Sequence, residues 1–226
     1  MRSPNNTQRL SIIGKTGEGK SHAGAFFLSL RDFKIPFVII NSKNDFDIFG
    51  NFKYTKILSL DENIDQYSSL FMIIPQVGEE KYLDDFLNRI WQNGDCGLFI
   101  DEAADLKGIR SYEKILRQGR SKCIPVIQIT QRPTDVTRSF YSESEFFDIF
   151  KVIDTRDQET ISKFCPLVYS HNPKKRNESD WGKLKKRESF YYDVAEDNLT
   201  ILQPLPDLES ISETINRKTK PKLKIF

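Results

Sequence analysis

The chain has 226 residues, of which 38% are hydrophobic and 12% aromatic, enough for the core of one globular domain. It holds 34 Lys and Arg against 32 Asp and Glu, so its net charge of +2 favours no class of charged ligand. Three dispersed cysteines and two histidines argue against a disulfide scaffold or a zinc fold. No apolar run reaches the ~20 residues that span a bilayer, and no signal peptide is evident, so we expect a soluble cytoplasmic protein without a transmembrane segment.

Short apolar runs alternate with amphipathic segments over most of the chain. We expect strands at 9–13, 36–40, 70–74, 97–100, 124–129 and 146–153, and helices at 21–31, 82–91, 109–118 and 157–164. This alternation is typical of βαβ units around a central, mostly parallel sheet with helices on both faces. The sequence therefore predicts an α/β fold.

The last quarter of the chain breaks this pattern and segregates its charge. Residues 172–187 hold seven basic and two acidic side chains, residues 188–215 hold seven acidic and no basic ones, and residues 216–226 hold five basic and no acidic ones. We expect a core over residues 1–170 and a C-terminal extension over residues 171–226 that packs on the core or projects from it.

Residues 14–21, GKTGEGKS, fit the phosphate-binding pattern G-x-x-x-x-G-K-[ST] (Walker A) between an expected strand and an expected helix. The glycines let backbone N–H groups point at phosphate oxygens, and the helix N-terminus adds partial positive charge. Lys20 is expected to contact the β- and γ-phosphates, and the Ser21 hydroxyl to ligate Mg²⁺. The alternative is a glycine turn with an incidental lysine. The residues expected to bind ATP are Gly14, Lys15, Thr16, Gly17, Glu18, Gly19, Lys20, Ser21 and His22.

The apolar run at 97–100 ends in two adjacent carboxylates. Asp101 is the expected metal-side (Walker B) residue, and Glu102 the residue that orients or deprotonates the attacking water. The alternative is a strand that ends in two solvated acids. Because a kinase has less need of a water-activating glutamate, the pair favours hydrolysis of a nucleoside triphosphate.

Gln131 follows another expected buried strand, at the sheet edge where ligands of parallel sheets bind. Its amide could bond both the γ-phosphate and the water, which makes it a candidate sensor of the nucleotide; the alternative is a turn before Pro133. Arg117 and Arg120 precede that strand. Either could act as an arginine finger on a neighbouring subunit, with Arg120 favoured, or both could be surface arginines.

Three segments together carry a family pattern: GKTGEGKS, GLFIDEAADL and RQGRSKCIPVIQITQRPTDV. In this order they resemble the FtsK–HerA superfamily of DNA-translocating ATPases, over roughly residues 9–165. The resemblance implies a RecA-like ASCE P-loop NTPase core that hydrolyses ATP with Mg²⁺ in a ring, usually a hexamer. It also assigns the trans-acting finger to Arg120, the sensor to Gln131 and the base to Glu102.

Because the phosphate-binding loop starts at residue 14, we expect no further N-terminal module, membrane anchor or C-terminal winged helix. In this the chain is most like the genome-packaging ATPases of tailless, membrane-containing viruses with double-jelly-roll capsids. The resemblance implies ATP-driven packaging of double-stranded DNA into a preformed capsid, in the host cytoplasm or at the packaging vertex, with vertex or portal proteins as possible partners. The alternatives are a DNA-transfer or filament-assembly ATPase of the same superfamily, a P-loop kinase, and a binding module with a relic P-loop.

Residues 172–187 are the expected DNA contact, because DNA affinity comes mostly from phosphates. Trp181, between two basic clusters, is a candidate for stacking or wedging. A solvated loop is the alternative. Residues 216–226 could form a second DNA contact, an anchor or a plain tail. The expected DNA-binding side chains are Lys174, Lys175, Arg176, Lys183, Lys185, Lys186 and Arg187.

Overall fold

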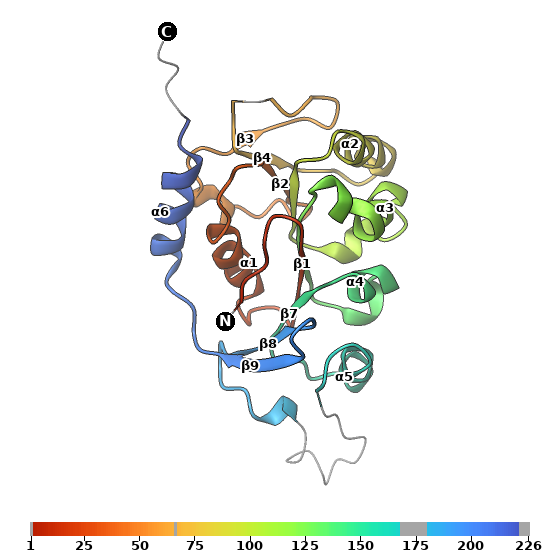
Figure 1. Ribbon diagram of the computed structural model, residues 1–226, viewed down its shortest axis with the longest axis vertical. Helices are drawn as coiled ribbons and strands as arrows, with labels where there is room; N and C mark the ends of the chain where they lie inside the picture. Colours follow the sequence, from red (N-terminus) through yellow and green to blue (C-terminus); the bar gives the residue numbers. More distant parts are fainter. Residues whose placement is uncertain (1, 66, 168–179, 222–226) are drawn as a thin grey trace.

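The computed structural model describes residues 2–65, 67–167 and 180–221, and its described strands form one nine-stranded sheet (Figure 1). The strands are β1 Arg9–Ile13, β2 Phe37–Ile40, β3 Lys56–Ile57, β4 Leu70–Ile73, β5 Gly97–Ile100, β6 Val126–Thr130, β7 Phe146–Ile149, β8 Ser189–Asp193 and β9 Asn198–Leu202. Their order across the sheet is β3-β4-β2-β5-β6-β1-β7-β8-β9. The first seven pair in parallel and the last two antiparallel, which confirms the predicted α/β fold with a mostly parallel sheet.

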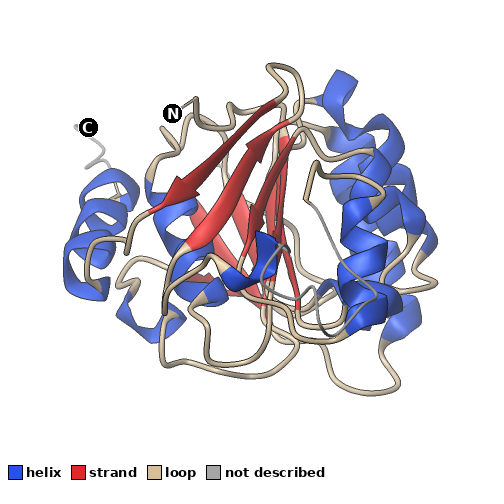
Figure 2. Cartoon of the chain, turned by 90° about the horizontal axis from the view of Figure 1, so that it is seen from below, coloured by secondary structure: helices blue, strands red, loops and turns tan. Residues whose placement is uncertain are grey.

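Helices cover both faces of the sheet, as predicted (Figures 1 and 2). They are α1 Lys20–Ser29, α2 Glu80–Asn93, α3 Arg110–Gln118, α4 Arg138–Ser142, α5 Thr155–Ser162 and α6 Leu208–Thr219. In Figure 1, α1 and α6 lie on one side of the sheet, and α2, α3, α4 and α5 on the other.

Alternation along the buried strands explains the two layers, because successive side chains of a strand point to opposite faces. In β2, Phe37 and Ile39 pack in the apolar cluster that contains α1 and α6, whereas Val38 and Ile40 pack in the cluster that contains α2 and α3. Both faces are therefore buried, as expected of strands in a parallel sheet.

The C-terminal region contains elements that the sequence analysis did not predict. β8 pairs with β7, so the sheet continues into the part of the chain expected to form an extension. β3 and α4 were also not predicted, and the strand expected at 146–153 ends at Ile149. The expected boundary at residue 170 lies outside the described residues and stays a prediction.

Helix α6 is fastened to α1 by both apolar and polar contacts. Ile211 and Ile215 are buried in the cluster that also holds residues of α1. Lys218 Nζ donates to the carbonyl oxygens of Ser29 and Arg31 at 2.6 and 2.8 Å, at the C-terminal end of α1, where carbonyl groups lack helical partners. Within the described ranges, no helix has the length and apolar character needed to cross a membrane.

Candidate active site

The carboxyl ends of the central strands bring the predicted site residues to one edge of the sheet. The 14–21 loop follows β1, Asp101 and Glu102 follow β5, and Gln131 follows β6. Because β6 lies between β1 and β5, the glutamine is placed between the phosphate-binding loop and the carboxylates. This is the edge at which open parallel sheets bind ligands.

Two features of the phosphate-binding loop require glycine. A Cβ added at Gly14 would lie 2.6 Å from Cβ of Phe150, the residue that follows β7. Gly17 and Gly19 have φ angles of 83° and 103°, in the left-handed region where side chains are disfavoured. The loop therefore needs its glycines for close packing and for its turns.

Lys20 begins α1 and is 5% exposed. Its Nζ donates to the carbonyl oxygen of Lys15 at 2.8 Å, so the ammonium lies across the loop. Burial and, to a smaller extent, the positive charge of Lys43 lower the pKa of Lys20 to about 8, although Glu102 and Asp101 act in the opposite direction. A phosphate bound in the loop would favour the charged ammonium.

The Ser21 hydroxyl donates to Asp101 Oδ1 at 2.9 Å, which joins the loop to the end of β5. A hydroxyl and a buried carboxylate are hard oxygen ligands that fit Mg²⁺, which proteins commonly hold with one or two carboxylates plus substrate phosphates. Among the described residues there is no cluster of three or more His, Cys, Asp or Glu that would form an all-protein metal cage. The binding of Mg²⁺ by Ser21 and Asp101 stays a prediction.

Lys43, which the sequence analysis did not single out, forms ion pairs with both carboxylates. Its Nζ lies 3.4 Å from Asp101 Oδ2 and 3.2 Å from Glu102 Oε2. Buried Asn41 holds this loop after β2, since its side chain donates to the Asp45 carbonyl at 2.9 Å and accepts from the Asp45 N–H at 3.1 Å. The lysine thus supplies the positive charge that two adjacent, buried carboxylates need.

Gln131 touches both halves of the site. Its Oε1 accepts a hydrogen bond of 2.5 Å from the Thr16 hydroxyl of the phosphate-binding loop. Its backbone N–H donates to Glu102 Oε1 at 3.3 Å. A change in the loop would therefore reach the glutamate through one residue, which is the arrangement that the sensor role requires; the role itself stays a prediction.

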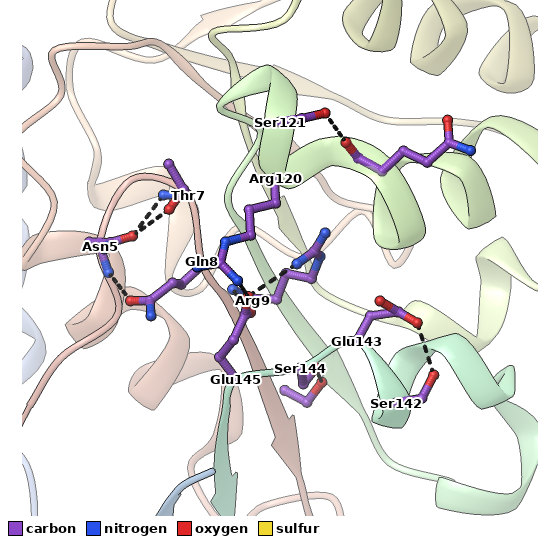
Figure 3. Close-up of polar contacts among 12 residues, drawn as sticks. Asn5, Thr7, Gln8, Arg9, Arg120, Ser121, Ser142, Glu143, Ser144 and Glu145 are labelled. Atoms are coloured by element: carbon purple, nitrogen blue, oxygen red, sulfur yellow. Dashed lines mark hydrogen bonds and ion pairs between the residues drawn. The ribbon is translucent and has the colours of Figure 1, made fainter. Parts of the chain in front are cut away.

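The structure does not bring the two predicted arginines to this site. Arg120 lies 3.9 Å from Glu145, which also pairs with Arg9 at 3.3 Å at the start of β1 (Figure 3). The four residue steps of β1 from Arg9 to Ile13 separate this edge from the phosphate-binding edge by roughly 13 Å. Arg117 Nε donates to Ser139, and its Nη2 lies 3.4 Å from Glu113. Both guanidinium groups are well exposed, as a group acting on another subunit would need to be.

The expected DNA-binding residues are only partly described. Lys174, Lys175 and Arg176 lie outside the described residues. Lys183, Lys185, Lys186 and Arg187 are exposed, and Lys183 pairs with Asp180 at 2.5 Å. The stacking role considered for Trp181 is wrong, because this side chain is 3% exposed and packs in the apolar core rather than facing solvent.

Comparisons with known proteins agree with this site, in which a phosphate-binding loop lies beside an acidic strand end with Gln131 between them. No family model matches the chain. The DNA packaging ATPase P9 of Enterobacteria phage PRD1 is 34% identical over 214 residues, which are 93% of this chain and 93% of that protein. The chain belongs to the family of viral DNA-packaging ATPases. This membership confirms the predicted resemblance.

Solved structures agree on the fold of this packaging ATPase family member. The genome packaging NTPase B204 from Sulfolobus turreted icosahedral virus 2, in complex with AMPPCP, has a TM-score of 0.68 at 19% identity and covers 89% of this chain and 100% of its own. EssC (ATPases 2 and 3) from Geobacillus thermodenitrificans has a TM-score of 0.58 at 11% identity and covers 94% of this chain and 44% of its own. At these identities the likeness establishes the P-loop ATPase fold.

Proposed function

We propose that this chain hydrolyses ATP to move double-stranded DNA into a viral capsid. The observation that carries the proposal is the assembly of Lys20, Ser21, Asp101, Glu102 and Gln131 at one sheet edge, in a member of the viral DNA-packaging ATPase family. A phosphate-binding loop alone would also suit a kinase. The glutamate that can activate water accepts a hydrogen bond from the backbone N–H of Gln131, and its presence favours hydrolysis.

Each residue has a distinct task in this proposal. Lys20 and the loop N–H groups bind the phosphates, and Ser21 and Asp101 would hold Mg²⁺, which when bound neutralises charge on the phosphate oxygens. Glu102 orients the attacking water and accepts its proton. Gln131 moves its amide from Thr16 to the γ-phosphate, so the same side chain that contacts the loop reports on the nucleotide.

The proposed assembly is a homo-oligomeric ring, most simply a hexamer. It works at the packaging vertex in the host cell, with vertex or portal proteins as partners. The support is the place of Arg120, an exposed guanidinium at the sheet edge opposite its own phosphate-binding loop. In a head-to-tail ring this edge can face the nucleotide of the next subunit, where the arginine would stabilise transition-state charge.

Hydrolysis of ATP, measured with and without duplex DNA, tests the proposed activity. Glu102→Gln is expected to keep ATP affinity and to lose about 10²–10⁴-fold in turnover, because only proton transfer is removed. Glu196→Gln, a change of the same kind at an exposed glutamate in the turn between β8 and β9, is the matched control and should remain active. An active Glu102→Gln variant, or a wild type with no response to DNA, would contradict the proposal.

Mixing two inactive variants tests the ring. Lys20→Ala removes phosphate binding, and Arg120→Ala removes the finger, so each alone should hydrolyse little ATP. In a mixture, Arg120→Ala subunits can receive the arginine of Lys20→Ala neighbours, and activity should reappear. Mixtures that stay inactive, or an Arg120→Ala variant that is fully active, would refute action in trans; Arg117→Ala serves as the comparison.

The salt dependence of DNA affinity tests the basic segment. Lys185→Gln and Lys186→Gln should each reduce the slope of log K against log salt by about 0.9 if the side chain neutralises a phosphate. Lys107→Gln, an exposed lysine beside the carboxylates, is the control of equal charge change. An equal loss of slope in all three variants would point to a general charge effect rather than to a DNA-contacting segment.

A further inference from the structure

Glu145 lies at the N-terminal edge of the sheet, one residue before β7, and is held there by the start of β1 (Figure 3). Its Oε2 accepts a hydrogen bond of 2.8 Å from the Arg9 N–H, and its own N–H donates to the Arg9 carbonyl oxygen at 3.2 Å. Its Oε1 lies 3.3 Å from Arg9 Nη1, and the Arg9 side chain is 4% exposed. The carboxylate is therefore fixed by backbone and side-chain contacts to one buried residue.

Arg120 contacts the same carboxylate more loosely. Its Nη1 lies 3.9 Å from Glu145 Oε1, and its side chain is 68% exposed. No other carboxylate in the described part of the chain forms an ion pair with Arg120. One negative charge thus faces two guanidinium groups, and the buried Arg9 has the shorter contacts. Because an exposed ion pair at this distance is weak, Arg120 can leave Glu145 while Glu145 stays with Arg9.

The backbone that carries Arg120 is anchored, so its side chain is the part that can move. Arg120 belongs to the 3₁₀ turn Gly119–Lys122, which follows α3. The Gly119 carbonyl oxygen accepts from the Ile124 N–H at 2.9 Å, and the Arg120 carbonyl oxygen accepts from the Cys123 N–H at 3.2 Å. The turn therefore presents the guanidinium at the edge, and the contacts of the side chain decide the direction in which it points.

We propose that Glu145 is a positioning residue for the arginine finger: it holds the Arg120 guanidinium over the N-terminal edge until the triphosphate of the next subunit binds it. The inference rests on the proposed ring, because it takes Arg120 as the finger. A triphosphate carries several negative charges, whereas the single charge of Glu145 is shared with Arg9, so the guanidinium is expected to move to the nucleotide. Holding the long side chain at the interface beforehand reduces the conformational entropy that is lost when the arginine binds phosphate.

The contacts of Arg117 differ in the way that this role requires. Arg117 Nε donates to the Ser139 hydroxyl at 3.1 Å, and its Nη2 lies 3.4 Å from Glu113 on its own helix. These contacts hold Arg117 against α3 and α4, and neither of them involves Glu145. The two candidate fingers are thus held differently, and Arg120 is the one at the edge that the proposed ring turns toward its neighbour.

Placing Glu145→Gln in one kind of subunit at a time tests this role. In a mixture of full-length Lys20→Ala and Arg120→Ala chains, the first supplies the finger and the second supplies the nucleotide site. Glu145→Gln added to the finger-supplying chain should lower the recovered ATP hydrolysis about tenfold, a small part of the loss of about 10³-fold or more that removal of a finger causes. Added to the chain that supplies the site, it should change the recovered activity by less than about twofold, because that chain has no Arg120 to position.

Glu143→Gln is the matched control at the same edge, because Glu143 contacts Ser142 rather than Arg120 and its substitution should have no effect in either chain (Figure 3). Glu145→Asp keeps the inference testable if the glutamine variant fails to fold. It retains the charge beside Arg9 but withdraws it from Arg120 by one methylene, so it too should act in the finger-supplying chain alone.

Two results would overturn the inference and leave the proposed ring standing. An equal loss of activity in both placements would show that Glu145 has only a structural role, and no loss in the finger-supplying chain would show that Arg120 needs no positioning. A mixture that stays inactive without any change at Glu145 would instead overturn the finger in trans, and the positioning role with it.

Discussion

Replacing Lys43 with methionine tests whether one lysine neutralises the acidic pair of the active site. The ammonium lies 3.4 and 3.2 Å from Asp101 and Glu102, whose side chains are 3% and 10% exposed. At an effective dielectric constant of about 20, each pair has a Coulomb energy of about 5 kcal/mol. Desolvation offsets most of it, and the 30% exposure of Lys43 screens the remainder. We therefore expect Lys43→Met to lower the free energy of unfolding by about 2 kcal/mol.

Thermal unfolding measures this change directly. For a chain of this size, about 2 kcal/mol corresponds to a fall in Tm of roughly 4–8 °C. Lys107→Met, at an exposed lysine that lines the same cleft as Lys43, is the matched control and should shift the free energy by less than about 0.5 kcal/mol.

A double-mutant cycle with Glu102→Gln assigns the effect to the ion pair. The two substitutions should be less than additive by about 1–2 kcal/mol, since each removes the same interaction. Saturating Mg²⁺ and ATP should reduce the cost of Lys43→Met, because another cation then faces the carboxylates. An additive cycle, or a Lys43→Met variant as stable as wild type, would refute the account of Lys43 as the neutralising charge.

Three further outcomes are expected. Since burial lowers the pKa of Lys20 to about 8, ATP binding should take up protons at and above that pH, and ATP affinity should fall as the pH rises further. Calorimetry in buffers of different ionisation enthalpy measures the proton uptake, and Lys20→Arg is the comparison that should not depend on pH in this range. Burial raises the pKa of Asp148 from 3.8 to about 7, so between these pH values the folded state holds a proton that the unfolded state releases. Relative to Asp148→Asn, the free energy of unfolding of wild type, measured by denaturant titration, should fall by about 1.4 kcal/mol per pH unit between about pH 4 and 7. Equal pH dependence in the two proteins would contradict this. Gly14→Ala should cost about 1–3 kcal/mol through its clash with Phe150 and lose ATP binding, whereas Gly50→Ala, with its nearest contact at 3.5 Å, should do neither.

Local pattern was sufficient to predict the central sheet and its functional edge. The strands that carry the site are short, apolar and buried on both faces, and each ends directly before its polar residue, as at Asp101 and Gln131. Because parallel strands end at one edge, the residues after them could be grouped before their pairing was known. The strand order β5-β6-β1 then sets which of them touch.

Lys43 could not be found in this way. It follows a predicted strand, but its partners are defined by the pairing of β2 with β5, which depends on residues far apart in the sequence. The lysine belongs to no motif, and a lysine in a polar loop ordinarily indicates only solvent exposure. Its function in the structure depends on the buried Asn41 that closes the loop around it.

The sequence of α6 contains a local helix pattern that the acidic residues around it made hard to recognise. Ile211 and Ile215 are four residues apart, as on one helix face, and the Asp207 side chain accepts from Ser210 N–H at 2.8 Å as an N-cap. Because the region holds seven acidic and no basic side chains between residues 188 and 215, it was assigned only to a C-terminal extension. The basic residues around Trp181 likewise indicated exposure, although the indole is part of the core.

The contacts of α1 explain why these late elements matter to the site at the start of the chain. One end of α1 forms the phosphate-binding loop and is tied through His22 to Pro206, while the other end is capped by Lys218 of α6. Both ends of the helix are thus held by residues that lie within 12 positions of each other in the sequence. A displacement of the loop cannot be absorbed by fraying of α1 without breaking one of these contacts, so it must be shared with the C-terminal region.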